Sequence, residues 1–465
     1  MTTLHLDFEV SSTVDLKAAG LYRYAADPST RVLLLGWAIN NQAVQVWDAT
    51  LGRPMPVKLQ RALADPKVKL CAFNAAFERI ILRDTLKIDT PIQRWHCTMV
   101  HGFSLGFSGG LADMALATSI NQQKDTRGRQ LIARFCCPQP ASRKVQAWDR
   151  HNDPEGWAEL IQYCEQDVRT ERELQDFFDQ YPMGEELLQG WYLDQTINDR
   201  GLPIDRQLVT QALKLADQAK DGLMTELRQL TDLDNPNSNQ QLQSWLQTQG
   251  VACYELQDAT VTQLLEDPKL PKPARQALQL KQQLAKSSVS KYVVLDAATA
   301  ADGRRRGALG YLGASRTGRW AGRLLQPQNF PRPAKGINVD AIIDALITDQ
   351  PIVRPLHALA AALRGTIAAG KSNTLVVADL AGIEGRVLPW ACGFQYKLDQ
   401  IRAGRDMYKV AAAGIYRCDY EEVDSDMRFV GKVCELALGY AGGIGALNTM
   451  ATAYGLPPYD DAVGK

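Results

Sequence analysis

The sequence has no run of 18 or more apolar residues, and its first ten residues, MTTLHLDFEV, lack the basic stretch followed by an apolar one that marks a secretory signal. We therefore expect neither a membrane span nor a signal peptide, and we expect a cytoplasmic protein. Cysteines are few: of the nine, only Cys136 and Cys137 are adjacent, and no C-x-x-C pair occurs. This scatter argues against a disulfide framework or a zinc site and indicates free thiols in a reducing compartment.

An excess of either charge is also lacking, because 52 basic residues balance 52 acidic ones. The balance conceals a basic segment between Lys281 and Lys335, where eleven Lys or Arg accompany two Asp, a net charge of +9. One interpretation is a solvated basic surface, and the other is a surface that contacts the phosphates of a nucleic acid. Under the second interpretation, neutralising Arg304, Arg305 and Arg306 should reduce the salt dependence of binding.

A chain of 465 residues is too long for one hydrophobic core, so two to four domains are expected. Residues 1–183 alternate strand and helix patterns, which predicts an α/β unit with a mixed sheet. Residues 184–301 are mostly helical in pattern. From residue 302 onward, Gly- and Arg-rich strands precede a long apolar helix and then the strand pattern NTLVVADL.

The octet GTIAAGKS, from Gly365 to Ser372, matches the phosphate-binding loop G-x-x-x-x-G-K-S without a mismatch. Such a loop requires a buried strand before it and a helix after it. Here the preceding VRPLHALAAALRG has a helical pattern, and the following NTLVVADL has a strand pattern. Because this order is reversed, the octet predicts a polar turn leading into a buried strand, and an ATPase or GTPase is disfavoured.

Carboxylates gather on one face of the N-terminal strand LHLDFEV. The apolar residues of this stretch alternate with His5, Asp7 and Glu9, which therefore share the opposite face. Taken alone, the pattern is better explained by a half-exposed strand with solvated charges. Two carboxylates side by side are also a place where a pair of divalent cations would bind.

Two later stretches add oxygen ligands. FNAAFE places Asn74 at the end of a strand and Glu78 four residues later. YCEQD places the phenol of Tyr163 and the carboxylate of Asp167 one helical turn apart, on one face. Hard oxygen ligands without His or Cys suit Mg²⁺ or Mn²⁺.

In this order, D-x-E, N-x-x-F-acid and Y-x-x-x-D resemble the three motifs of proofreading 3′→5′ exonucleases of the DEDD type, tyrosine subclass. The resemblance implies an RNase H-like fold with two divalent cations, in which Tyr163 orients the attacking water and Asn74 contacts DNA. The implied metal ligands are Asp7, Glu9, Glu78 and Asp167. The family usually has Asp at the position of Glu78, so the extra methylene would either shift a metal or give Glu78 an outer-sphere role.

SRTGRWAGRLLQPQNFP, from Ser315 to Pro331, resembles the T-G-R…Q-N-x-P stretch of family A DNA polymerases, and VVADLAGIEGRVL resembles their motif A. In that family the first stretch contacts the primer–template minor groove, and the second binds a catalytic metal and checks the nucleotide sugar. The implied DNA contacts are Arg319, Gln328 and Asn329. The resemblance further implies Asp379 as a catalytic metal ligand, Glu384 as the gate against a 2′-hydroxyl, and Arg386 as its support and a DNA contact.

RFVGKVCELALGYAG, from Arg428 to Gly442, resembles motif B, the fingers helix of the same family. Its residues at four-residue intervals share one helix face, and the resemblance implies that this face binds the incoming nucleotide. The face consists of Arg428, Lys432, Leu436 and Tyr440. Lys432 would also protonate the leaving pyrophosphate. Two positions depart from the family: Leu436 stands where Phe or Tyr is usual, and Ala441 stands where Gly is expected.

The resemblance extends over nearly the whole chain, because INDRGLPID and NPNSNQQL look like the thumb of these polymerases. It implies a multidomain α/β protein with a right-hand architecture, of bacteriophage type, in the cytoplasm of a bacterial host. The expected domains are an exonuclease (1–183), a thumb (184–301), the N-terminal part of a palm with motif A (302–390) and fingers (391–465). The expected partners are primer–template DNA, single-stranded 3′ ends, dNTPs and two divalent cations, Mg²⁺ or Mn²⁺, per active site.

Family A polymerases carry a further metal-binding acid in a late His-Asp-Glu motif, which none of the five histidines of this sequence begins. We therefore expect a fragment of a longer polymerase, and we expect the 465-residue chain to shorten primers without extending them. Three alternatives remain open: a proofreading DNA polymerase, an exonuclease that only holds DNA with its C-terminal part, and a non-catalytic DNA-binding remnant.

Overall fold

The protein is described by a computed structural model covering residues 2–125, 127–139, 147–285, 288–315, 317–334, 336–370, 372–439, 442–457 and 459. The chain divides into two compact units, Met1–Thr374 and Leu375–Lys465. Some residues singled out in the sequence lie outside the described ranges, namely Lys286, Arg316, Lys335, Lys371, Tyr440 and Ala441. Within the described ranges, no helix is long and apolar enough to cross a membrane.

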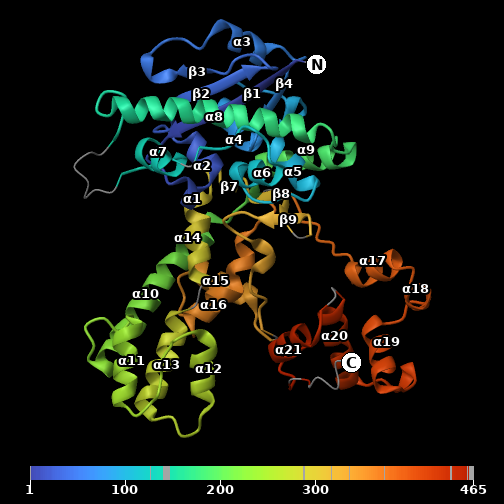
Figure 1. Cartoon of the computed structure of the whole chain (residues 1–465). Coiled ribbons are helices and arrows are strands. Elements are labelled where there is room, and N and C mark those ends of the chain that lie inside the picture. Colours follow the sequence, from blue (N-terminus) through green and yellow to red (C-terminus); the bar gives the residue numbers. More distant parts are fainter. Residues whose placement is uncertain are drawn as a thin grey trace. The chain divides into compact units, whose positions relative to one another are not determined.

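A five-stranded mixed sheet forms the centre of the N-terminal part (Figure 1). In spatial order the strands are β3 (Gln45–Asp48), β2 (Arg31–Ile39), β1 (Thr3–Ser11), β4 (Lys69–Ala72) and β5 (Trp95–Cys97). β1 pairs antiparallel with β2 and parallel with β4. The mixed α/β sheet predicted from the sequence is therefore confirmed.

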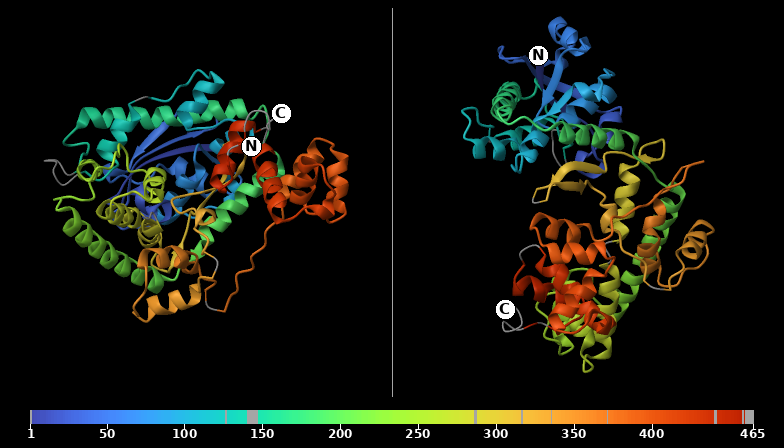
Figure 2. Two further views of the ribbon diagram at one scale, coloured as in Figure 1. Left: turned by 90° about the horizontal axis from the view of Figure 1, so that it is seen from below. Right: turned by 90° about the vertical axis from the view of Figure 1, so that its right-hand side faces the viewer.

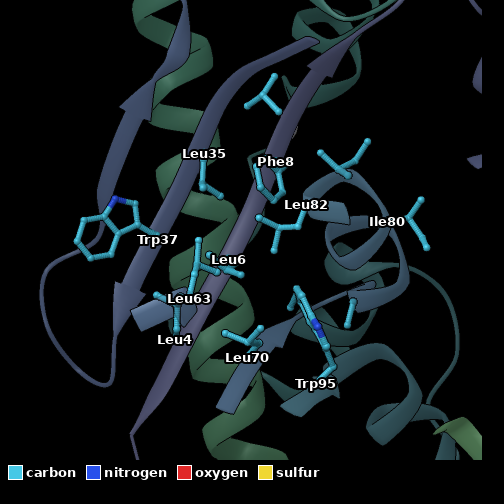
Figure 3. Close-up of a cluster of buried hydrophobic side chains, with 14 of the residues drawn as sticks. Leu4, Leu6, Phe8, Leu35, Trp37, Leu63, Leu70, Ile80, Leu82 and Trp95 are labelled. Atoms are coloured by element: carbon cyan, nitrogen blue, oxygen red, sulfur yellow. The ribbon is translucent and has the colours of Figure 1, made fainter. Parts of the chain in front are cut away.

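The alternation along β1 separates two environments. Leu4, Leu6 and Phe8 point into a hydrophobic core that they share with Leu35 of β2 and Trp95 of β5 (Figure 3). Because successive side chains of a strand point to opposite faces, the acidic residues of β1 lie on the other face of the sheet.

Helix α8 (Pro154–Phe178) lies along this second face, as Figure 1 and the left view of Figure 2 show. Its start is fixed by Asp153, which accepts a hydrogen bond from a backbone N–H of the first turn at 3.1 Å, and by Pro154 in that turn. The helix approaches β2 closely at Gly36. A Cβ at this position would lie 2.9 Å from Val168 Cγ2 and 3.0 Å from a backbone oxygen of α8.

Shorter helices surround the sheet. They are α1 (Leu16–Ala19), α2 (Leu21–Ala26), α3 (Val57–Ala64), α4 (Ala75–Ile80), η2 (Ile81–Thr85), α5 (Thr98–Ser104), α6 (Leu111–Thr118) and α7 (Gly128–Phe135), with the 3₁₀ turns η1 (Ala49–Leu51) and η3 (Ile92–Arg94). Helix α4 follows β4 after a short turn, and this turn carries Asn74, while Glu78 lies one turn into the helix. The junction therefore presents both residues close to the carboxyl end of β4.

The next helices form two further hydrophobic cores. They are α9 (Glu185–Arg200), α10 (Arg206–Thr231), α11 (Asn239–Thr248), α12 (Asp258–Glu266), α13 (Lys272–Leu284) and α14 (Ser288–Ala298). One core joins the end of α10 to α11, α12 and α13, and the other joins the start of α10 to α14 and later helices. Helix α9 packs elsewhere, because Trp191 belongs to the core of the β-sheet.

The remainder of the first unit contains two small antiparallel sheets and two helices. Strand β6 (Leu202–Pro203) pairs with β7 (Arg304–Arg305), and β8 (Leu309–Ala314) pairs with β9 (Arg319–Gly322). The helical segments are η4 (Pro327–Asn329), α15 (Val339–Ile347), α16 (Pro355–Ala362) and η5 (Leu363–Thr366).

The prediction that NTLVVADL is a buried strand is wrong. Residues 373–380 have no regular secondary structure, and the Val376 and Val377 side chains are 91% and 89% exposed. An apolar run becomes a strand only where a neighbouring strand satisfies its backbone groups, and no described strand pairs with this segment. The helix expected before the octet GTIAAGKS is present as α16.

The second unit is helical among its described residues. Its helices are α17 (Ile383–Ala391), α18 (Gln395–Arg402), α19 (Met407–Tyr416), η6 (Tyr420–Glu422), α20 (Ser425–Leu438) and α21 (Ile444–Ala453). Helices α19 and α20 pack closely at Gly431, where a Cβ would lie 2.2 Å from Tyr408 O. Val433 and Leu447 form part of the small core between α20 and α21.

Candidate functional site

Four carboxylates from three elements meet beside the second face of the sheet. Asp7 and Glu9 come from β1, Glu78 from α4 and Asp167 from α8. Glu9, Glu78 and Asp167 are 5%, 4% and 4% exposed. Carboxylates are almost never buried to this extent without a partner, so the group requires positive charge or protons.

The pKa values of these acids reflect both burial and proximity. Burial, followed by the charge of Asp167, raises the pKa of Asp7 to about 7. Burial also raises the pKa values of Glu9 and Glu78 well above their usual range, and Asp7 is the largest contributing charge for each. The four carboxylates therefore act on one another electrostatically, although they are up to 160 positions apart in the sequence.

Several oxygens of this group are buried without a hydrogen-bond partner among the described residues. They are Oε2 of Glu78, Oδ1 of Asp167 and Oδ1 of Asn74. A buried acceptor that remains unpaired is costly, and a divalent cation bound by oxygen ligands would remove that cost. The donor set, which consists of carboxylate and amide oxygens, fits Mg²⁺ or Mn²⁺.

Tyr163 lies one turn before Asp167 on α8 and is 2% exposed. Its ring packs against the start of α7 at Gly128, where a Cβ would lie 2.2 Å from Tyr163 Cε2 and 2.8 Å from the hydroxyl. The absence of a side chain at Gly128 therefore leaves the space that the phenol occupies.

Lys124 enters the same site and was not predicted from the sequence. Its ammonium group forms an ion pair with Oδ2 of Asp167 and lies 4.7 Å from the centroid of the Tyr163 ring. No motif marks Lys124, because the contact joins residues 43 positions apart. The charged pair Lys124-Asp125 lies in a loop, and such a short stretch does not by itself mark a functional residue.

A second buried polar group lies next to the carboxylates and was also missed. Glu171 accepts hydrogen bonds from Thr98 Oγ1 at 2.5 Å and Cys71 Sγ at 3.2 Å, and its other oxygen lies 2.7 Å from His5 Nδ1. Burial alone would raise the pKa of Glu171, but His5 and these hydrogen bonds lower it below its usual value. Since these contacts satisfy Glu171, we interpret the group as a polar clamp between α8 and strands β1 and β4.

The residues that resemble polymerase motif A lie in or near an exposed segment. Asp379 is exposed in the irregular stretch before α17, and Glu384 and Arg386 are exposed on α17 itself. Arg386 Nε donates a hydrogen bond to Ala381 O at 2.8 Å. The three residues are thus neighbours in the sequence, and none of them lies in a strand of the structure.

The residues that resemble motif B share one face of α20. Arg428 Nε donates to Asp406 Oδ2 at 2.7 Å, and Lys432 Nζ lies 4.8 Å from the centroid of the Tyr454 ring. Leu436 is half-buried on the same helix. The fourth member of the face, Tyr440, lies outside the described residues.

The residues expected to contact the minor groove belong to the first unit. Arg319 lies on β9, and Gln328 and Asn329 lie in the turn η4. All three side chains are exposed. They are therefore accessible on the surface of the unit that also contains the carboxylate group.

The expectation that Arg304, Arg305 and Arg306 form a phosphate-binding surface is not supported. Arg305 is 2% exposed and donates to two backbone carbonyls. Arg304 donates to the carbonyl of Arg200 at 2.6 Å, and Arg306 pairs with Asp302 at 2.6 Å. Arg304 and Arg306, whose Nε donates to Asp199 O at 2.8 Å, thus hold this segment against the end of α9, whereas Arg305 binds the carbonyl groups of Gly307 and Arg323. The count of charges does not reveal these contacts.

Comparison with known proteins defines first the class and then the family. In fold the chain is similar to the POL domain of Pol1 from M. smegmatis, solved in complex with DNA primer–template and dNTP. The TM-score is 0.58 at 15% identity, and the match covers 97% of this chain and 70% of that one. The fold is thus that of a DNA polymerase domain.

In sequence the chain is 36% identical over 467 residues to the DNA polymerase of Bacillus phage SP02, and the match covers 97% of this chain and 71% of that protein. The chain belongs to the family of this phage DNA polymerase. No family model matches the sequence.

Proposed function

We propose that the protein is a template-directed DNA polymerase with a 3′→5′ proofreading exonuclease, and that residues 1–183 form the exonuclease with an RNase H-like fold. The observation that carries the exonuclease is the group of four carboxylates beside Tyr163, of which Glu9, Glu78 and Asp167 are buried and Glu78 and Asp167 each have an unpaired oxygen. Its substrate would be the 3′ end of a DNA primer, held partly by Asn74.

In this function Asp7, Glu9, Glu78 and Asp167 hold two divalent cations, Mg²⁺ or Mn²⁺. When bound, such cations activate water and stabilise the charge that develops on the attacking and leaving oxygens. The Tyr163 phenol orients the water on the side of Asp167. The sheet and α8 keep the ligands at fixed positions, so the site is organised before the substrate arrives.

The polymerase function rests on family membership and on the resemblance of VVADLAGIEGRVL and RFVGKVCELALGYAG to motifs A and B. Asp379 is the proposed metal ligand, Glu384 the gate against ribose and Arg386 its support. Arg428 and Lys432 would bind the triphosphate, together with Leu436 and Tyr440, and Lys432 would protonate the pyrophosphate. Arg319, Gln328 and Asn329 would contact the primer–template duplex.

We assign residues 184–301 to a thumb, 302–390 to a palm segment and 391–465 to fingers. The division between the compact units after Thr374 lies within the proposed palm segment. A protein of the phage polymerase family would act inside the host cell on primer–template DNA and dNTPs.

The exonuclease is tested with Asp7→Asn, which removes one charge at nearly constant shape. Shortening of a labelled primer in Mg²⁺ should fall on the order of 10²-fold or more, because a catalytic cation loses a ligand. DNA affinity in a gel-shift assay should stay close to wild type. The matched control is Asp217→Asn, at an exposed position of α10. Primer shortening by Asp7→Asn at the wild-type rate would contradict the proposed site.

The same primer–template, incubated with dNTPs, tests the polymerase. Extension supports the polymerase and contradicts the expectation that these 465 residues shorten primers without extending them. Shortening alone supports the exonuclease, and an unchanged primer that still shifts on a gel supports a DNA-binding protein. In a form of the protein that extends the primer, Asp379→Asn should abolish extension and leave shortening intact.

A further inference from the structure

Lys124 is held at the carboxylate group by contacts that do not depend on its own ion pair. It lies between α6 and α7, in a segment that is fastened to α8. Glu173 of α8 accepts hydrogen bonds from the backbone N–H groups of Asn121 at 2.9 Å and Gln122 at 2.8 Å. Gln166 Nε2 of the same helix donates to Gln123 O at 2.9 Å. The helix that carries Asp167 therefore also positions Lys124.

The ammonium group of Lys124 supplies positive charge inside an acidic site. It pairs with Oδ2 of Asp167 and lies over the face of Tyr163, where a cation is attracted by the ring. The Lys124 side chain is 25% exposed, whereas the side chain of Asp167 is 6% exposed. The aliphatic part of Lys124 thus extends from the surface to the buried carboxylate of Asp167. A cation that enters from solvent would reach the same carboxylate.

A divalent cation and Lys124 would use the same carboxyl group. Oδ1 of Asp167 is buried and unpaired, and Oδ2 is taken by Lys124. Two positive charges on one carboxyl group repel each other strongly in a site largely removed from water. The ion pair between Lys124 and Asp167 is therefore compatible with the metal-free site. It opposes the entry of a divalent cation, which would have to displace the Lys124 ammonium group.

We propose that Lys124 is a built-in counter-cation of the metal-free exonuclease site, which stabilises the buried carboxylates and competes with a divalent cation for Asp167. The inference rests on the proposed exonuclease. Binding of the cation releases the Lys124 ammonium group from Asp167 toward solvent. Lys124 thus acts through Asp167, one of the proposed metal ligands.

The test compares wild type with Lys124→Met, which keeps an unbranched side chain one atom shorter and removes its charge, and with Lys124→Arg, which keeps the charge. Mn²⁺ affinity is measured calorimetrically on the full chain. Lys124→Met should bind Mn²⁺ about tenfold more tightly, because one competing positive charge is gone. Lys124→Arg should bind like wild type. The matched control is Lys58→Met, at an exposed position of α3.

Thermal unfolding in EDTA and in Mg²⁺ gives a second readout that does not depend on activity. In EDTA, Lys124→Met should melt several degrees below wild type, and Mg²⁺ should remove most of this difference. If Lys124→Met is recovered only in the presence of Mg²⁺, Lys124→Gln replaces it and the same two measurements decide.

Equal or weaker Mn²⁺ binding by Lys124→Met, relative to wild type, would overturn the inference and leave the exonuclease standing if primers are still shortened. Tighter binding with no primer shortening by wild type would support the counter-cation and overturn the exonuclease. Absence of Mn²⁺ binding by both proteins would overturn both proposals.

Discussion

Single residues decide whether the carboxylate group works as a site, and Gly128 illustrates this because it shapes the space around Tyr163. The aromatic ring occupies the volume that a side chain at Gly128 would fill, with 2.2 Å between the hypothetical Cβ and Tyr163 Cε2. The phenol is itself buried, so it has little room to retreat. A methyl group at this position must displace the ring or the start of α7.

Gly128→Ala should therefore reduce primer shortening strongly and lower stability by about 1–3 kcal/mol, the usual cost of overpacking. Stability is measured by denaturant unfolding, and activity with a labelled primer in Mg²⁺. The control is Gly222→Ala, because no atom lies within 4 Å of a Cβ there. Wild-type activity in Gly128→Ala would show that the position of Tyr163 is not critical.

The protonation of Asp7 makes a prediction about pH. Its pKa, raised to about 7 by burial and by Asp167, lies above that of an unfolded chain, near 4. The folded state then binds more protons than the unfolded state between these two values. Stability is accordingly lost as the pH rises through this interval, and the loss is complete above pH 7.

In EDTA, the free energy of unfolding should fall between pH 4 and pH 7 by on the order of 3 kcal/mol from Asp7. Asp7→Asn should flatten this dependence, and saturating Mg²⁺ should offset it, since a bound cation favours the ionised carboxylates. Denaturant titrations at several pH values measure the effect. A stability that rises over this interval in EDTA would contradict the electrostatic description of the site.

At the scale of elements, the site depends on how closely α8 lies on the sheet. Gly36 of β2 is the register partner of Asp7 and faces α8 at the level of Val168. Replacing Gly36 by Ala would place a methyl group 2.9 Å from Val168 Cγ2, so α8 would have to move away from β2. Asp167 would move with it, away from Asp7.

We expect Gly36→Ala to lower stability by about 1–3 kcal/mol and to weaken Mn²⁺ binding. Calorimetry and denaturant unfolding measure the two effects. Gly184→Ala is the matched control, since no atom lies within 4 Å of a Cβ at that position. If Gly36→Ala loses stability but keeps Mn²⁺ affinity, the spacing between β2 and α8 does not control the site.

Elements with a local signal could be predicted from the sequence. The alternation in β1 predicted which residues are in the core, and the four-residue spacing of Tyr163 and Asp167 predicted a shared helix face. The contact of Lys124 with Asp167 could not be predicted, because its segment is placed by Glu173, about 50 positions away. Residues 373–380 show the opposite error, because their apolar character is visible in the sequence whereas the absence of a pairing strand is not.

At the scale of the whole molecule, the basic segment has to be separated into structural and accessible charges. The net charge of +9 between residues 281 and 335 suggested an interaction with phosphates, but the three consecutive arginines in it are committed to backbone and carboxylate partners within the fold. Arg319 and Arg332 are exposed instead. Accessible charges release counterions from DNA when they bind phosphates, whereas buried ones do not.

The log of the affinity for primer–template DNA should therefore fall linearly with the log of the salt concentration. The double variant Arg319→Gln, Arg332→Gln should flatten the slope by about 1 for each phosphate that it no longer neutralises. Arg305→Gln should leave the slope unchanged and lower the melting temperature, because Arg305 is buried and the change removes its hydrogen bonds to the carbonyl groups of Gly307 and Arg323. Fluorescence anisotropy over a range of salt concentrations measures the slopes. A flatter slope in Arg305→Gln, with no change in the double variant, would contradict this prediction. It would mean that Arg305 contacts DNA phosphates and that Arg319 and Arg332 do not.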